Sequence, residues 1–171
     1  FVAAREESRV YFASGAEFYS LVIDDQELRR VFSDSKIKKI SHNLKEAGIF
    51  FSQNGIELNG LYFDTMLAAY LLEPSLASFD LVELAYKYLE RRYQPGRISP
   101  EQALDIIIRI SPVLHQPTAS STIETSQLPS FFEGVGTQTI ARSRSLKTIR
   151  SPTDIFRFLK SREVVFLRNG S

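Results

Sequence analysis

The chain has 171 residues and a formal net charge of +1, so no global charge attracts it to nucleic acid or acidic lipid. The sequence contains no cysteine and two histidines, His42 and His115, which excludes disulfides, thiolate zinc sites and a multi-histidine metal site. Any metal ion would need oxygen ligands, which magnesium and manganese prefer. No apolar run can span a bilayer and the opening residues are not a signal peptide, so we expect a cytoplasmic protein without a membrane partner.

The opening of the chain predicts an antiparallel hairpin followed by a helix. Residues 1–4 and 10–13 are apolar and flank a polar connection, a pattern typical of two paired strands. Asp24 or Asp25 can cap a helix whose apolar positions repeat at helical spacing. These positions are Leu28, Val31 and Phe32.

A strand, a helix and another strand are expected next. Residues 36–41 predict a short strand, and Asn43 predicts the N-cap of a helix. That helix should end at Asn54-Gly55, because this pair favours a left-handed stop. The apolar residues between 56 and 63 predict a further strand, interrupted by Asn59-Gly60.

Three more helices are predicted before residue 116. Asp64 opens a helix that Pro74 ends, and we expect it to be buried on more than one side because it is apolar nearly all round. Ser78 can cap the next helix, and Pro100 stands at the start of the third. Strands placed early and helices alternating afterwards predict an α/β or α+β layer fold.

The composition changes near Pro117. From there to about Ser151, serine, threonine and glutamine dominate, a composition typical of a linker or a disordered segment. A final apolar patch predicts a helix over 155–159 and a strand over 164–167. We therefore expect a folded domain over residues 1–116 and a low-complexity extension over residues 117–171.

Residues 38–89 carry several motifs in a fixed order. They are Asn43-Leu44-Lys45, Gly55-Ile56-Glu57-Leu58, Phe63-Asp64-Thr65-Met66-Leu67, then Tyr70, Leu72 and Pro74, and then Phe79-Asp80-Leu81-Val82-Glu83-Leu84-Ala85. In this order they resemble the 3′–5′ exonuclease domain of bacterial family A DNA polymerases, the DNA polymerase I type. The resemblance covers about the first two-thirds of the chain. It implies a ribonuclease H-like α/β fold, in which helices flank a mixed sheet.

The resemblance also implies where metal ligands should lie. The family's nuclease holds two metal ions with an Asp-x-Glu pair on the first strand, an Asp four residues after the Asn of Asn-Leu-Lys, and a late Tyr-x-x-x-Asp motif. This chain opens within what resembles the second strand, so we expect the N-terminal strand with the first pair to be missing from it. Ala47 stands at the second place, and Ile98 and Gln102 stand at the Tyr and Asp of the third. These positions, with Asn43, form a degenerate family site, and no catalytic or metal-binding residue is assigned.

Asp64, Thr65 and Tyr70 are assigned to a structural motif. An Asp that opens a helix is a common N-cap, and the resemblance also treats Asp64 as structural; the alternative is that Asp64 is a metal ligand.

Neighbouring carboxylates are a second alternative for replacing the lost ligands. Glu46 and Glu101 adjoin the lost positions, and Asp105 lies about one turn after Gln102. One residue along a helix turns a side chain by about 100°, so Glu46 should point away from the place of Ala47.

The missing carboxylates resemble a variant of the family found in Bacillus-type polymerases, which keep the exonuclease fold and do not proofread. Residues 67–74, LAAYLLEP, look particularly like that branch. The resemblance implies a vestigial domain without a cofactor that supports a polymerase domain in DNA replication and repair, with DNA as a partner through the parent polymerase.

Two rival functions remain open. One is an active 3′–5′ exonuclease that needs Mg or Mn and acts on single-stranded DNA ends. The other is a non-catalytic nucleic-acid-binding module, although basic residues of this kind more commonly form a solvated surface. Such a module would use Lys36, Lys38, Lys39 and Lys45, or Arg142, Arg144, Lys147 and Arg150.

Overall fold

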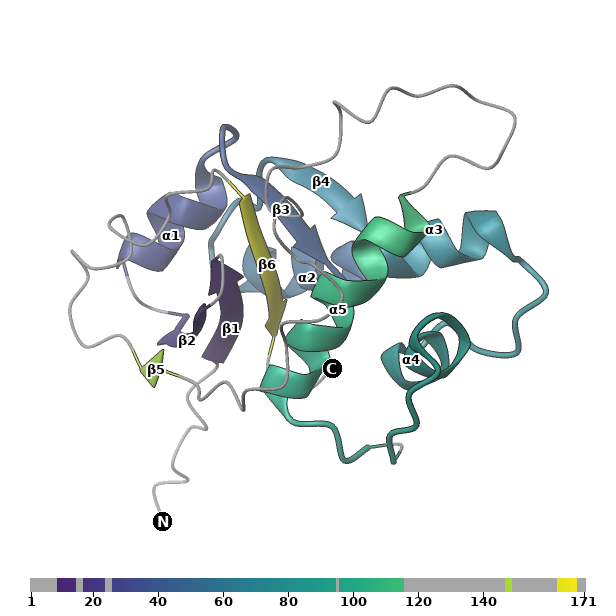
Figure 1. Cartoon of the computed structure of the whole chain (residues 1–171). Helices are drawn as coiled ribbons and strands as arrows, with labels where there is room; N and C mark the ends of the chain where they lie inside the picture. Colours follow the sequence, from purple (N-terminus) through teal and green to yellow (C-terminus); the bar gives the residue numbers. More distant parts are fainter. Residues whose placement is uncertain are drawn as a thin grey trace, which may run out of the picture.

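The computed structural model describes residues 9–14, 17–23, 26–94, 96–115, 147–148 and 163–168. Within them, helices cover both faces of one mixed six-stranded sheet (Figure 1). The strands are β1 Arg9–Ser14, β2 Glu17–Val22, β3 Lys38–Ser41, β4 Leu61–Asp64, β5 Lys147–Thr148 and β6 Glu163–Arg168. The helices are α1 Gln26–Ser33, α2 Leu44–Gln53, α3 Thr65–Leu72, α4 Leu81–Leu89 and α5 Pro100–Leu114. This arrangement confirms the α/β fold with a mixed sheet and flanking helices.

The strand order across the sheet is β4-β3-β6-β1-β2-β5. β1 and β2 form an antiparallel hairpin, and β5 runs parallel to β2 at one edge. β3 and β4 are parallel neighbours at the other edge. β6, drawn in yellow in Figure 1, lies in the interior, antiparallel to β1 and parallel to β3. The segment nearest the C-terminus therefore joins the two halves of the sheet.

Side chains alternate between two cores because successive residues of a strand point to opposite faces. On β6, Val164 and Phe166 join the core that α1 and α2 cover. Val165 and Leu167 join the core that α3, α4 and α5 cover. A sheet buried on both faces explains why the β6 sequence is a continuous apolar run.

The hairpin that the structure describes is not the predicted one. Residues 10–13 lie in β1 as expected, but β1 pairs with residues 17–22, for which no strand was predicted. The proposed partner, residues 1–4, lies outside the described residues, as do Asp24 and Asp25. The strand predicted from residue 56 is shortened to β4, because Gly60 has a positive φ of 70° and ends the extended path before Leu61.

The helices predicted before residue 116 are confirmed with small corrections. Asn43 caps α2, and Asp64 caps α3. Asp80, rather than Ser78, caps α4, and the Ser78 hydroxyl donates to the Asp80 carboxylate at 2.7 Å. α5 begins at Pro100, as expected, and Ser99 caps it. None of the helices in the described residues is long and apolar enough to cross a membrane.

The expectation that α3 is buried on several sides is wrong. Thr65 and Ala69 are buried, whereas Leu67 is 55% exposed and Leu71 is 71% exposed. The helix packs on β4 and α5 along one side, and it lies beyond the sheet where no further layer of described residues covers its outer face (Figure 1). Its apolar composition therefore does not report burial within this chain.

The extension predicted over residues 117–171 lies mostly outside the described residues. The strand predicted over 164–167 is confirmed as β6, and residues 147–148 form β5. The helix predicted over 155–159 lies outside the described part. The sheet thus crosses the boundary placed at residue 116, because its interior strand comes from beyond it.

We expect Phe166→Ala to lower the free energy of unfolding by about 3–5 kcal/mol, because Phe166 is fully buried and packs against Phe32 and Phe51. The matched control is Leu71→Ala, on the exposed face of α3, which should change it by less than about 0.5 kcal/mol. Urea unfolding of the two variants measures the difference. Equal effects would show that β6 is not a core strand.

Candidate functional site

Two parallel strands end side by side at the candidate site. Ser41, the last residue of β3, is paired in register with Asp64, the last residue of β4. α2 starts three residues after Ser41, and α3 starts directly after Asp64. The N-termini of two helices are therefore brought together at the carboxyl ends of the strands, where α/β folds commonly bind ligands.

The Asp64 carboxylate holds both helix N-termini. One oxygen accepts from the backbone N–H of Met66 at 2.9 Å and of Leu67 at 3.3 Å in α3, and also from Asn43 at 3.1 Å. The other oxygen accepts from Leu44 N–H at 2.7 Å at the start of α2. The unpaired backbone N–H groups of a helix N-terminus attract an acceptor of this kind, because a carboxylate can take several hydrogen bonds at once. Asp64 thus has the geometry of a shared cap.

Asn43 makes the sharp entry into α2. Its backbone is left-handed, with φ 59° and ψ 62°, a conformation that Asn tolerates better than most residues. Its side-chain oxygen accepts from Glu46 N–H at 3.3 Å. The turn lets the N–H groups of residues 43 and 44 face Asp64 while the Asn43 side chain caps the next turn.

A chain of polar contacts runs from the sheet to His42. The Ser41 hydroxyl donates to the carbonyl of Phe166 in β6 at 2.7 Å. The Thr65 hydroxyl donates to the Ser41 carbonyl at 3.4 Å, and Thr65 Oγ1 lies 2.9 Å from His42 Nδ1. Ser41 and Thr65 are both buried, so these contacts fix the position of the His42 ring.

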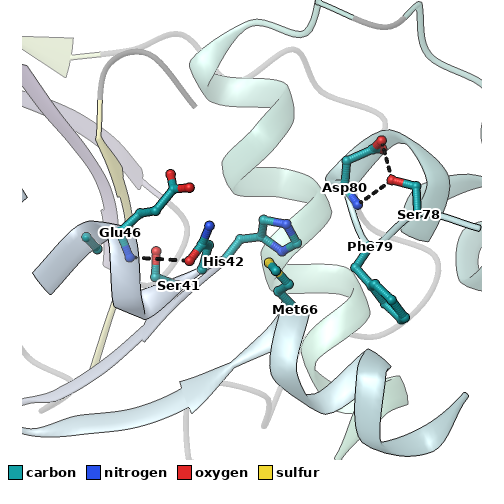
Figure 2. Close-up of a pocket in the computed structure, with 9 residues that line it drawn as sticks. Ser41, His42, Glu46, Met66, Ser78, Phe79 and Asp80 are labelled. Carbon is teal, nitrogen blue, oxygen red and sulfur yellow. Dashed lines mark hydrogen bonds between the residues drawn. The ribbon is translucent and has the colours of Figure 1, made fainter. Parts of the chain in front are cut away.

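His42 faces a cavity of about 360 Å³ between the start of α2 and the start of α4 (Figure 2). Met66 and Phe79 provide much of its apolar lining, and Glu46 and Asp80 are its acidic residues. No lysine or arginine of the described residues lines it. The residues around the cavity are Ser41, His42, Asn43, Glu46, Ala47, Met66, Ser78, Phe79 and Asp80.

Burial lowers the pKa of His42 to about 4, and the nearby carboxylates of Asp64 and Asp80 oppose this shift only in part. The ring is therefore neutral at pH 7. Nothing in the sequence pattern marked His42 as a site residue, although its place directly after a parallel strand and before an N-cap could have done so.

The structure brings two of the four degenerate positions to this cavity. Asn43 and Ala47 both border it. Gln102 and Ile98 do not, within the described residues. Gln102 serves the start of α5 instead: its side chain accepts from Ser99 N–H at 2.9 Å, and its own N–H donates to Ser99 Oγ at 3.3 Å.

The other structural-motif residues also lie near the cavity. Thr65 holds His42, as described above. Tyr70 is half exposed, and its ring meets that of Phe79 edge to face with centroids 5.6 Å apart. Tyr70 thereby supports a residue that lines the cavity.

The carboxylates considered as replacement ligands are dispersed or already paired. Glu46 lines the same cavity as Ala47, and it is exposed. Asp105 accepts from Arg109 Nε at 2.7 Å and lies 3.8 Å from the guanidinium of Arg91. Glu101 does not line the cavity in the described part of the chain.

The described residues do not fit a metal centre. They contain no group of three or more His, Asp or Glu side chains placed to hold a metal ion. β6, the strand next to β3, has apolar residues at positions 164–167. With alanine at position 47 as well, the donor set around the cavity does not suit the two metal ions of the family's nuclease.

The four lysines considered for phosphate binding do not form one exposed surface. Lys39 is buried and its ammonium donates to the Asp34 carbonyl; burial lowers its pKa to about 8. Lys38 lies over the Tyr62 ring, 4.3 Å from its centroid, and pairs with Glu163 at 3.4 Å. Lys36 and Lys45 remain exposed. Arg142, Arg144 and Arg150 lie outside the described residues, and for Lys147 the backbone alone is described.

The α/β fold with its mixed sheet is consistent with a ribonuclease H-like domain. The family model described as "DNA polymerase I, ribonuclease H-like domain" matches residues 2–95. Because that match covers more than half of the chain, the chain belongs to this family, which confirms the resemblance to the 3′–5′ exonuclease domain of family A polymerases.

Curated relatives agree with this assignment. DNA polymerase I of Geobacillus stearothermophilus is 42% identical over 52 residues, which is 30% of this chain and 6% of that protein. DNA polymerase I of Mycobacterium leprae is 37% identical over 79 residues, 46% of this chain and 8% of that protein. DNA polymerase I of Mycobacterium bovis is 32% identical over 105 residues, which is 61% of this chain and 11% of that protein. The chain thus spans a small part of each relative.

We expect Asp64→Ala to lower the free energy of unfolding by about 2–4 kcal/mol, because two helices lose a cap. Asp80→Ala is the matched control: it removes the cap of a single helix, α4, and should cost about 1 kcal/mol. Urea unfolding at pH 7.5 compares them. Equal losses would contradict the shared cap.

The His42 pKa makes stability depend on pH. The unfolded ring titrates near 6.5 and the folded ring near 4, so the unfolded state takes up the proton first. The neutral His42 ring contributes fully to the free energy of unfolding above pH 6.5. This contribution falls as the pH drops from 6.5 to 4, by about 3 kcal/mol at most.

We therefore expect His42→Gln, which cannot titrate, to lose less stability than the wild type between pH 7.5 and pH 4.5. Urea unfolding at several pH values gives both slopes, and the pH 7.5 values report the cost of the substitution itself. Parallel slopes would show that the His42 ring is not held neutral by burial.

Proposed function

We propose that this chain is a catalytically vestigial 3′–5′ exonuclease-like domain of the Bacillus-type branch, which supports the polymerase domain of a DNA polymerase I in DNA replication and repair. Its partner in that role is DNA, reached through the parent polymerase, and the setting is cytoplasmic. The domain needs no cofactor of its own. The observation that carries the proposal is the alanine at position 47, at the edge of a cavity around which the described residues place too few acidic ligands for a metal pair.

Charge is the physical reason. Two divalent cations close together repel each other, and several carboxylates must converge to offset that repulsion. Around the cavity the carboxylates are Glu46 and Asp80, and Asp80 is committed to capping α4 through Glu83 N–H at 2.8 Å. Loss of even ~5 kcal/mol of metal-derived transition-state stabilisation slows cleavage by roughly three to four powers of ten.

The degenerate positions support the same proposal. Asn43, Ala47, Ile98 and Gln102 each have a structural task in place of a chemical one: a left-handed helix entry, a buried helix contact, a core contact and a capping box. The identity with the Geobacillus polymerase favours the Bacillus-type branch.

Nucleic-acid binding by the cavity is disfavoured by its charge. Glu46 and Asp80 are the charged residues of its lining, and no lysine or arginine of the described residues lines it. Of the four lysines considered for phosphate binding, Lys39 is buried and Lys38 pairs with Glu163, which leaves Lys36 and Lys45 for phosphate contacts.

We expect no Mg- or Mn-dependent shortening of a 5′-labelled single-stranded oligonucleotide from its 3′ end above background. Ala47→Asp alone should not create activity, because one carboxylate cannot hold two divalent ions. Gel analysis with excess metal measures both proteins. Cleavage by the wild type that is lost in Asp64→Ala, Glu101→Ala or Asp105→Ala would mean that the domain is an active exonuclease.

A further inference from the structure

β6 occupies a gap that the rest of the described sheet leaves open. β1 and β3 are not neighbours; each pairs with β6 instead. Val10 to Ala13 pair with Arg168 to Val165 on one side, and Lys38 to Ile40 pair with Glu163 to Val165 on the other. Without β6, two strands would each present an unpaired edge in the interior of the sheet.

β6 is held in this gap by contacts to its backbone and to its side chains on both faces of the sheet. The Ser41 hydroxyl donates to the Phe166 carbonyl, and the Phe166 ring lies 4.9 Å from the Phe32 ring and 5.7 Å from the Phe51 ring. On the opposite face Val165 and Leu167 enter the core that α5 covers. Main-chain pairing combined with pockets for alternate side chains is how folds bind an added strand.

The connection of β6 to the rest of the fold is long. α5 ends at Leu114, and β6 begins at Glu163. Of residues 116–162, which lie between the described parts, only β5 at 147–148 is described. The edges of β1 and β3 therefore hold a strand that is distant from both in the sequence.

We propose that the gap between β1 and β3 is a strand-acceptor site that binds an extended apolar peptide, antiparallel to β1 and parallel to β3. β6, tethered through residues 116–162, is its occupant in this chain. Because the recognition lies in the edges and the two cores, the same peptide binds when it is no longer covalently attached.

The test uses the full chain with a specific protease site inserted within residues 120–140. After cleavage, a fluorescent peptide with the sequence of residues 161–170 is added in excess, and anisotropy and size-exclusion chromatography follow its binding. We expect the two cleaved pieces to co-elute at micromolar concentration. Cutting the connection makes the pairing of β6 with β1 and β3 bimolecular but does not remove it. The labelled peptide should then exchange into the site and bind saturably.

Two variant peptides provide the controls. Phe166→Asp should bind at least ~100-fold more weakly, because it places a charge between Phe32 and Phe51. Glu163→Gln, at the end of the strand, should bind within about tenfold of the wild type, because its partner Lys38 is half exposed.

The outcomes separate clearly. The proposal is supported if the larger piece unfolds once it is separated from the piece with β6, and if the wild-type peptide restores its cooperative unfolding transition. If the larger piece keeps its transition and binds no peptide, or binds the Phe166→Asp peptide equally well, the strand-acceptor site does not exist. Neither result depends on nuclease activity, so the proposed function is tested separately.

Discussion

The carboxylate of Asp64 joins the N-termini of α2 and α3, and the layout of the candidate site depends on that contact. β3 and β4 end in register, so two helices begin at the same edge with unpaired backbone N–H groups. One anion satisfies groups from both. This arrangement places Asn43, His42 and Thr65 around one point and opens the cavity between α2 and α4. Asp64, which could be a metal ligand from its sequence alone, thereby has its carboxylate oxygens bonded to backbone N–H groups.

Local signals predicted the elements whose cause is local. The caps Asn43 and Asp64 and the start of α5 at Pro100 follow from side chains that satisfy helix ends, so they could be predicted from sequence. The exposure of α3 could not, because its burial depends on which surfaces surround it and not on its composition. The place of β6 was also beyond prediction: its apolar run indicates a strand but contains no information on which two edges it joins.

The candidate site could be predicted in part. Position 47 was located from its spacing after Asn43, and it does border the cavity. Gln102 was placed by a weaker pattern, and in the structure it belongs to the capping box of α5. His42 was missed because a single histidine carries no spacing signal. Its importance comes from burial and from Thr65, which is distant in sequence and adjacent in space. The proposed loss of function thus rests on the small number of carboxylates that the described residues place around the cavity.

The central claim is that this framework no longer holds a metal pair. Electron paramagnetic resonance of Mn²⁺ titrated into the full chain tests it directly, because bound and free ions give distinct signals. The account predicts no Mn²⁺ bound at micromolar concentrations and no change when Ala47 is replaced by serine. Tight binding of two Mn²⁺ ions per chain, weakened by Glu46→Gln or Asp80→Asn at the cavity, would contradict it.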